Sequence, residues 1–299
     1  MEDISLKFKK NVSLAAYSTY KIGGFADYFF IAQNQEDLKS AIIYARENNI
    51  HYFLLGAGAN ILFGDKGFRG LVIKNESDNV CFKDEYCIAE SGATIENLIS
   101  YSAEKGLSGL ENFAGIPSTV GGALWQNLHF LTADRKDTFF IEMLVDSVKI
   151  LDENNTECVV DRDFFEFGYD FSILHTRNIV VLEVTFKLFQ STKEKIKMQA
   201  NENIAWRKER QPQLDIYPSC GSVFKKIENV GAGRLIEKVG LKGHQIGGIK
   251  VSEKHANFLV NTGEGKASDV RTLIQKIQNE VKEQTGYWLE TEISFVGEF

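Results

Sequence analysis

Hydrophobic and polar positions along the first half of the chain alternate between the two-residue period of strands and the 3.6-residue period of helices. The helical period covers residues 34–49, where Asn34 has a side chain suited to an N-cap and acidic residues occupy the first turn. A second helix is predicted over residues 94–106, where Gly106 would close it. Short apolar runs predict strands over residues 26–32, 51–55, 70–74, 86–91 and 143–151.

The pattern changes near residue 190, where a long charged segment begins. Residues 192–211 predict a charged helix that connects two domains. Beyond it the pattern predicts two helices and two strands: helices over 233–240 and 268–284, and strands over 257–261 and 287–298. This mixture of helices and strands indicates an α+β fold, which we divide into residues 1–190 and 191–299.

The composition of the 299 residues is that of an ordinary globular protein, with 43% hydrophobic and 25% charged residues. No apolar run approaches the roughly 18 residues of a membrane span, and the charged amino terminus lacks the apolar core of an export signal. We therefore expect a cytoplasmic protein that does not bind membranes. The net charge of −7 with scattered lysines argues against nucleic acid as a partner, because phosphate binding needs concentrated positive charge.

The positions of cysteine and histidine disfavour the common metal sites. The four cysteines form no CxxC or other metal-ligand spacing and are too few for a disulfide framework, so we expect them to be reduced. The five histidines are too dispersed for a recognisable metal site. The sequence therefore predicts no bound metal.

A glycine-rich segment, "LLGAGANIL", follows the strand predicted over 51–55 and contains Gly56 and Gly58. Consecutive free backbone amides in such a loop form a concave anion site that suits a pyrophosphate. The loop lacks the third glycine of GxGxxG and no amphipathic helix follows it, which disfavours an ordinary Rossmann domain. A tight turn with purely structural glycines is the alternative.

A second glycine-rich segment, "GLENFAGIPSTVGGAL", lies some 60 residues further on. Its small residues allow the backbone to approach a flat ligand closely, and Ser118 and Thr119 offer hydroxyl groups. Two such loops favour one extended ligand that is bound at two places, and a dinucleotide has that length. A pair of unrelated turns is the alternative.

Six motifs in order make the chain resemble the UDP-N-acetylenolpyruvoylglucosamine reductase (MurB) family, in its shorter-loop, type II-like form. The resemblance extends over about residues 12–298, and six ordered motifs are far more specific than any one of them. The motifs are "STYKIGGFADYFF", "LLGAGANILFGDKGFRGLVI", "GLSGLENFAGIPSTVGGAL", "PSCGSVFKK", "LKGHQIGGIKVSEKHANFLVN" and "LETEISFVGE".

The resemblance implies an FAD-binding domain of the vanillyl-alcohol-oxidase (PCMH) type, followed by a MurB C-terminal α+β substrate domain whose last strand packs back on the FAD domain. It implies non-covalent FAD, which fits the absence of histidine from both loops, and NADPH as co-substrate. Thirteen residues match the FAD contacts of the family: Gly56, Ala57, Gly58, Ala59, Asn60, Ile61, Gly115, Ile116, Pro117, Ser118, Thr119, Gly121 and Gly122.

The resemblance also implies the chemistry, which is the reduction of an enol ether conjugated to a carboxylate. A hydride reaches the terminal vinyl carbon, and negative charge then develops on the neighbouring carbon and the carboxylate, where hydrogen-bond donors or cations must stabilise it. Ser222 matches the serine that protonates this carbon, and Glu292 matches the glutamate that helps to stabilise the enol. Lys225 would polarise the Ser222 hydroxyl or hold a carboxylate or phosphate.

Other interpretations of these residues are open. Cys220 has the chemistry of a nucleophile but is more typical of a small packing residue. No GxSxG motif surrounds Ser222, which disfavours a hydrolase. Lys225 and Glu292 would otherwise be solvated charges, and strand alternation would place Glu292 on one face with Glu290 and Ser294.

The chain departs from the family pattern at residue 170, where aspartate occupies the place of a catalytic arginine in the segment "GYDFSIL". An acid there would repel the forming carboxylate charge unless it points away or pairs with a cation. His175 or Arg177 would supply the missing positive charge, or Lys225 would, or the site has changed substrate or lost activity. We prefer substitution, because both loops, Ser222 and Glu292 persist.

A second departure is the segment "QNLHFLTADRKD", residues 126–137, which keeps Gln126 and Asn127 but replaces a glycine-rich turn of the family. His129 or Arg135 would then enter the cleft, although a surface loop is the simpler interpretation. Substrate contacts are expected from residues in matching motifs: Asn127, Tyr169, Arg207, Arg234, Lys242 and Gln245.

The resemblance predicts an enzyme of peptidoglycan precursor synthesis that acts on a small-molecule sugar nucleotide, with a monomer as the default state. A flavin-dependent oxidase of a sugar or alcohol is one alternative. A flavin- or nucleotide-binding regulator without turnover is the other, and it is motivated by the missing arginine.

Overall fold

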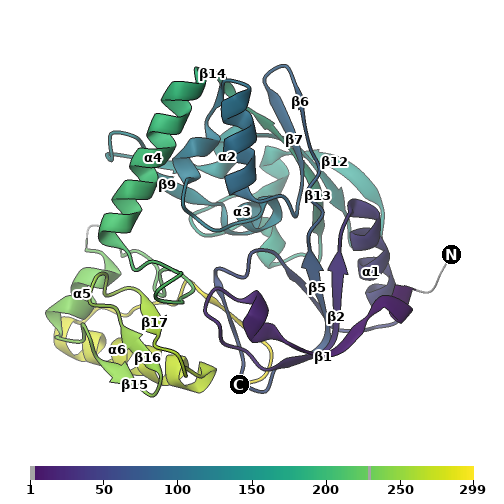
Figure 1. Ribbon diagram of the computed structural model, residues 1–299. Helices are drawn as coiled ribbons and strands as arrows, with labels where there is room; N and C mark the ends of the chain where they lie inside the picture. The colour runs from purple at the N-terminus through teal and green to yellow at the C-terminus, as the bar shows by residue number, and fades with distance from the viewer. Residues whose placement is uncertain (1–3, 228–229) are drawn as a thin grey trace. The chain divides into compact units, whose positions relative to one another are not determined.

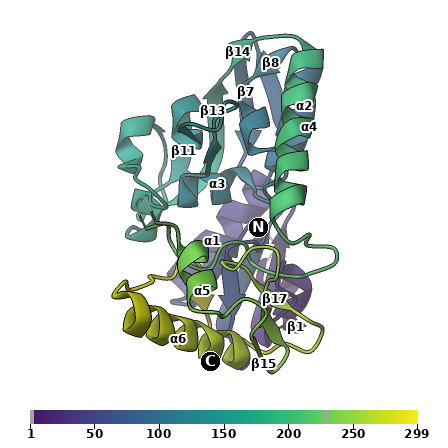
Figure 2. The same cartoon turned by 90° about the vertical axis from the view of Figure 1, so that its left-hand side faces the viewer.

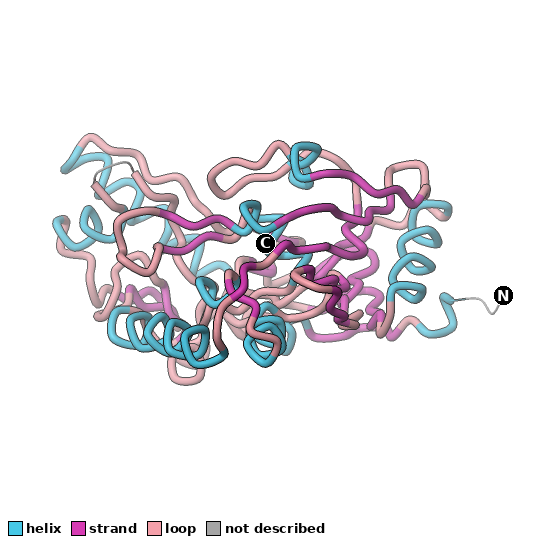
Figure 3. The backbone as a smooth tube through the Cα atoms, turned by 90° about the horizontal axis from the view of Figure 1, so that it is seen from above, coloured by secondary structure: helices cyan, strands magenta, loops and turns pink. Residues whose placement is uncertain are grey.

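The computed structural model describes residues 4–227 and 230–299. The chain forms two compact units, each built from several segments. The first comprises Phe30–Ala57 and Ile73–Arg207, together with the amino-terminal residues up to Phe8. The second comprises Lys9–Phe29, Gly58–Val72 and Lys208–Phe299. Helices and strands interleave along the chain, as the cyan and magenta segments of the tube show (Figure 3).

Most elements of the first unit are labelled in Figure 1. Its helices are α1 (Gln35–Glu47), α2 (Ile95–Glu104), α3 (Val120–Gln126) and α4 (Lys193–Arg210), of which α4 ends three residues beyond this unit. Its strands are β3 (Tyr52–Leu55), β6 (Val80–Lys83), β7 (Tyr86–Glu90), β8 (Leu107–Ser108), β9 (His129–Leu131), β10 (Thr138–Phe140), β11 (Val145–Leu151), β12 (Glu157–Asp161), β13 (Val180–Lys187) and β14 (Phe189–Gln190).

The second unit has fewer and shorter elements. Its helices are α5 (Ala232–Lys238) and α6 (Ala267–Thr285), and its strands are β1 (Lys9–Ser13), β4 (Ile61–Phe63), β15 (Gln245–Ile246), β16 (Ile249–Val251), β17 (Leu259–Asn261) and β18 (Ser294–Val296). Two further strands, β2 (Phe25–Ala32) and β5 (Phe68–Asn75), run from one unit into the other.

An antiparallel five-stranded sheet in the order β12-β11-β13-β7-β6 forms the centre of the first unit. The central strand β13 is apolar on both faces, since Val181, Val184 and Phe186 all belong to one hydrophobic core. Helix α2 contributes Leu98 to the same core. Figures 1 and 2 show α2 beside α4, where Glu104 pairs with two lysines of α4.

The second unit has its own hydrophobic core, formed by α5, α6 and the three-stranded sheet β15-β16-β17. Helix α6 presents Val270, Leu273 and Ile277 to this core. The Asp65 carboxylate accepts hydrogen bonds from the amides of Ala267 at 2.7 Å and Ser268 at 2.9 Å, which satisfies two free donors at the start of α6. Strand β18 pairs with β4 in parallel, with Ser294 opposite Ile61.

The structure confirms the helices and most of the strands predicted from the sequence. The Asn34 side chain caps α1 by accepting from the amide of Asp37, and Gly106 follows α2 with a φ of 68°. Of the strand predicted over 287–298, only β18 is present, and the rest of that prediction is wrong. The backbone of Glu290 and Glu292 instead forms hydrogen bonds with Lys225 and Val223, in the segment that contains Ser222. All four cysteines are free, as expected. Within residues 4–227 and 230–299, no helix is long and apolar enough to cross a membrane.

Candidate functional site

The first glycine-rich loop connects β3 to β4. Gly58 has a φ of 69°, and a Cβ atom there would lie 2.1 Å from the carbonyl oxygen of Tyr17, so no other residue fits this position without movement. Among the described residues, the amides of 57–60 donate no hydrogen bond to a protein acceptor. Free amides and a left-handed residue in one short loop are the features of an anion-binding nest.

Thr19 connects this loop to the segment before Ser222, a link that sequence inspection missed. Its amide donates to the carbonyl oxygen of Gly58 at 3.0 Å, and its hydroxyl lies 2.7 Å from the carbonyl oxygen of Ser219 and 3.2 Å from that of Gly58. The two carbonyls are 161 residues apart in sequence (219 − 58), so one side chain of the second unit contacts both Gly58 and Ser219. The only available signal was its place in the motif "STYKIGG".

The Thr19→Val variant is expected to weaken both loops while keeping the shape of the side chain. The Ser219 carbonyl would lose its donor, which typically costs about 1–3 kcal/mol when the group is buried. We expect a lower melting temperature and weaker flavin binding, measured by thermal unfolding and by titration of the apoprotein with FAD. An exposed threonine, Thr176→Val, is the control; equal melting temperatures for the two variants would contradict the proposed link.

The second glycine-rich loop is fixed against the segment that precedes α2. The Gly121 amide donates to Ser91 O at 2.8 Å, and the Val120 amide donates to Ala93 O at 2.9 Å. Thr119 caps α3 by accepting from the Gly122 amide at 3.3 Å. A Cβ atom on Gly56 would lie 2.6 Å from the Thr119 hydroxyl oxygen, so residues of the two loops meet in the first unit.

These loops fit a bound FAD. The unpaired amides of 57–60 suit the pyrophosphate, and Gly56 brings the backbone of the first loop against Thr119 of the second. Lys74 adds positive charge close by, since its Nζ donates to Gly56 O at 2.9 Å, and burial lowers its pKa. The individual FAD contacts predicted from the sequence stay predictions.

Ser222 and Glu292 are brought together by the backbone of the second unit. Ser222 pairs with Phe258, and the following residue, Val223, accepts a hydrogen bond from the Glu292 amide at 2.8 Å. The Asn257 side chain holds the same segment by accepting from the Phe224 amide and donating to its carbonyl. Among the described residues the Ser222 hydroxyl makes no hydrogen bond, so its proton is available.

Cys220 and Lys225 flank Ser222 and have different surroundings. Cys220 is 2% exposed in the core of the second unit, and burial raises the pKa of its thiol far above its usual range. A thiol that stays protonated is a poor nucleophile, so Cys220 is a packing residue. Lys225 pairs with Glu290 at 3.3 Å on an exposed surface, which leaves its assignment to the site a prediction.

Asp170 faces His129 in the first unit. The Asp170 side chain is 2% exposed, and its Oδ1 lies 3.7 Å from Nδ1 of His129. The surface-loop interpretation of residues 126–137 holds only for the hairpin tip: β9 and β10 pair as a hairpin, and the His129 ring contacts those of Phe140 and Tyr169. Only the tip of the hairpin is exposed, because strand pairing and aromatic contacts hold its base.

Arg207 and Arg135 both contact Phe130, with their guanidinium carbons 5.4 and 5.5 Å from its ring centroid. Arg207 also donates from Nε to Gly115 O at 3.1 Å. Its side chain is partly exposed, yet protein fills most of the space around the guanidinium, and this burial lowers its pKa to about 10. The structure thus brings Arg207 to the second glycine-rich loop.

The other expected substrate residues lie in two places. Asn127 is buried in the first unit and donates to Gly168 O at 3.0 Å, and Tyr169 contacts His129. Arg234, Lys242 and Gln245 have exposed or half-exposed side chains in the second unit, where Lys242 pairs with Glu237 of α5 at 2.7 Å. Their roles stay predictions.

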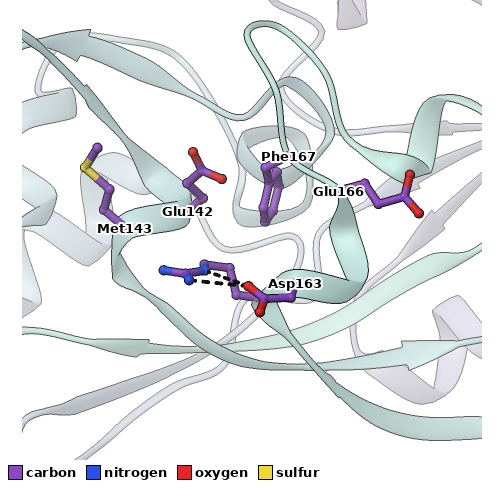
Figure 4. Close-up of a pocket in the computed structure, with 6 residues that line it drawn as sticks. Glu142, Met143, Asp163, Glu166 and Phe167 are labelled. Carbon is purple, nitrogen blue, oxygen red and sulfur yellow. Dashed lines mark hydrogen bonds and ion pairs between the residues drawn. The ribbon is translucent and has the colours of Figure 1, made fainter.

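Figure 4 shows a pocket of about 460 Å³ in the first unit that lies apart from this chemistry. Its lining includes three carboxylates and Arg162, which pairs with Asp163. None of the residues predicted from the sequence lines it. The full lining is Glu142, Met143, Arg162, Asp163, Glu166 and Phe167.

Comparison with known families matches most of the chain. A family model described as the C-terminal domain of UDP-N-acetylenolpyruvoylglucosamine reductase matches residues 211–296. A second model, described as an FAD binding domain, matches residues 26–160.

Individual relatives agree with these models. The UDP-N-acetylenolpyruvoylglucosamine reductase of Caldanaerobacter subterraneus subsp. tengcongensis is 40% identical over 98% of this chain and 94% of its own length. The reductase of Caldicellulosiruptor bescii is 38% identical over 100% of this chain and 94% of its own. The crystal structure of the reductase from Thermus caldophilus superposes with a TM-score of 0.80 at 30% identity, covering 97% of this chain and 99% of the other.

Proposed function

The chain belongs to the UDP-N-acetylenolpyruvoylglucosamine reductase family, and on that premise we propose that it reduces UDP-N-acetylglucosamine enolpyruvate to UDP-N-acetylmuramate for peptidoglycan synthesis. It is an FAD-dependent oxidoreductase, with an FAD-binding domain followed by the C-terminal domain of this family. The 40% identity over 98% of the chain carries this conclusion. The two glycine-rich loops would hold FAD, and the chemistry that FAD would supply is hydride transfer, with NADPH as the source and the terminal vinyl carbon of the substrate as the acceptor.

Ser222 and Glu292 are the residues to which we assign the proton chemistry. As the hydride arrives, negative charge builds on the neighbouring carbon and the carboxylate, and Ser222 gives this carbon its proton to complete the saturated ether. Glu292 would stabilise the enol, and Lys225 would assist Ser222. The backbone pairing of Val223 with Glu292 supports this assignment, because it holds both segments in one place.

The binding roles follow from the same family membership. We assign FAD to residues 56–61 and to the loop of residues 115–122, and the sugar nucleotide to a set of six residues. The unpaired amides of 57–60 support the first assignment. The six are Asn127, Tyr169, Arg207, Arg234, Lys242 and Gln245.

We also propose the domain division and the setting of the enzyme. Residues 1–190 would form the FAD domain and 191–299 the substrate domain, a division supported by family models that match within each range, at 26–160 and 211–296. The compact units differ from this division, since residues 9–29 and 58–72 belong to the second unit. We expect the protein to act in the cytoplasm as a monomer, without nucleic acid.

The purified protein is expected to be yellow and to oxidise NADPH only when the enolpyruvyl sugar nucleotide is supplied. Absorbance near 450 nm and at 340 nm would measure the two properties. Hydrogen peroxide formation from a sugar or alcohol without NADPH would instead identify an oxidase. A colourless preparation that cannot be reconstituted with FAD would rule out the flavoenzyme altogether.

A further inference from the structure

The two departures of the sequence from the family pattern meet in the structure. Asp170 occupies the place of the expected arginine, and His129 belongs to the hairpin that replaces the expected glycine-rich turn. They are 41 residues apart in the sequence (170 − 129), yet Nδ1 of His129 lies 3.7 Å from Oδ1 of Asp170. Because the two residues that depart from the family pattern contact each other, we interpret the two departures as one altered part of the site.

Asp170 needs a positive partner. Its side chain is 2% exposed, and neither carboxylate oxygen has a hydrogen-bond partner within the described part of the chain. An uncompensated buried carboxylate is unfavourable by several kcal/mol. Among the described residues, His129 is the group placed to supply an opposite charge.

The surroundings of His129 fix where its protons lie. Nδ1 faces the Asn127 carbonyl oxygen at 3.3 Å as well as Asp170, so this nitrogen carries a proton. The rings of Phe140 and Tyr169 hold the imidazole from two sides. Nε2 has no hydrogen-bond partner among the described residues, so this nitrogen is open to a ligand.

Two other candidates for the missing cation, Arg177 and His175, are engaged elsewhere. Arg177 forms a bidentate ion pair with Glu153, in which Nε donates to Oε1 at 2.8 Å and a terminal guanidinium nitrogen donates to Oε2 at 2.9 Å. Nε2 of His175 lies 2.8 Å from the carbonyl oxygen of Trp125, and its ring stacks on the Trp125 indole. In both cases the polar groups already have partners, whereas Nε2 of His129 does not.

We propose that His129, which lies 3.7 Å from the buried Asp170, is the cation of this active site and that it stabilises the anion formed when the substrate is reduced. His129 is a catalytic residue in this proposal, and Asp170 is a positioning residue that acts through it. The proposal rests on the proposed reductase function. His129 keeps its proton throughout, since Ser222 protonates the substrate carbon.

Half-reactions test the catalytic part. His129→Gln keeps a neutral donor and is expected to slow reoxidation of the reduced flavin by the substrate about 10²-fold, the usual effect of losing one such group. His129→Lys keeps a charge and is expected to stay within about tenfold of wild type. Reduction of the flavin by NADPH should change less than about threefold in both variants. Stopped-flow absorbance near 450 nm measures each step, with the exposed His51→Gln as the matched control.

Thermal unfolding tests the pair without substrate or turnover. His129→Gln leaves Asp170 uncompensated, so we expect the melting temperature to fall by about 5 °C or more. Asp170→Asn keeps the residue type that tolerates the left-handed φ of 53° and removes only the charge. The double variant should therefore recover most of the loss, with the exposed Asp146→Asn as the matched control.

The outcomes separate this proposal from the proposed function. If wild type turns over and His129→Gln reoxidises within about threefold of it, the proposal is refuted and the function stands. If Asp170→Asn restores nothing to His129→Gln, the ion pair is refuted. If wild-type flavin is never reoxidised by the enolpyruvyl sugar nucleotide, the proposed function fails and the catalytic role of His129 fails with it, while the melting temperatures still report on the pair.

Discussion

Replacing Ser222 with alanine is expected to slow substrate-dependent reoxidation of the flavin by about 10²–10⁴-fold, the range typical of a lost general acid. The carbon that bears the developing charge would then have to take its proton from water. Reduction of the flavin by NADPH involves no such proton, so its rate should not change. Rapid mixing of the pre-reduced enzyme with substrate, followed near 450 nm, isolates the affected step.

Ser219→Ala is the matched control for this prediction. Ser219 lies three residues from Ser222, and its buried hydroxyl has no partner among the described residues, so its loss removes no interaction that is present. The Ser219 carbonyl that Thr19 contacts is retained. We expect this variant to reoxidise at the wild-type rate. Similar rates for the two alanine variants would show that Ser222 is not the proton donor.

Replacing Gly58 with alanine is expected to abolish flavin binding and to destabilise the protein. The new Cβ atom would lie 2.1 Å from the Tyr17 carbonyl oxygen, so either Tyr17 or the loop must move. Movement of the loop would disturb the unpaired amides that suit the pyrophosphate. The left-handed backbone adds a further cost of about 1–2 kcal/mol for a residue with a Cβ atom.

Gly240→Ala separates the clash from the backbone strain. Gly240 has a φ of 75°, close to that of Gly58, but a Cβ atom there would meet nothing within 4 Å. We expect this variant to lose only the strain energy and to keep its yellow colour. Thermal unfolding and the flavin content of the purified proteins measure both effects. A yellow Gly58→Ala protein with the stability of Gly240→Ala would show that the loop tolerates the clash.

Local signals were sufficient to predict every α-helix except α3, which lies in the second glycine-rich segment. Asn34 caps α1 through a hydrogen bond to the Asp37 amide, and Gly106 follows α2 in a left-handed conformation, both within a few residues of the signal that predicted them. The prediction of a strand over residues 287–298 was wrong because the structure of this segment depends on partners that are distant in sequence. Its period was that of a strand, but the partners of residues 290 and 292 lie in the segment 223–225, which no local pattern specifies.

The sequence by itself determined five helices, most of the predicted strands, the family and the residue types of the site, because period, caps and ordered motifs are local properties of the chain. Only the tertiary structure decided which departures compensate each other. Asp170 and His129 looked like two separate defects, and they became one buried pair when the β9–β10 hairpin packed against the turn at residue 170. Thr19 likewise acquired its role from contacts with Gly58 and Ser219. Contacts between residues distant in sequence form only when the chain buries them together, so their partners cannot be read from either segment alone.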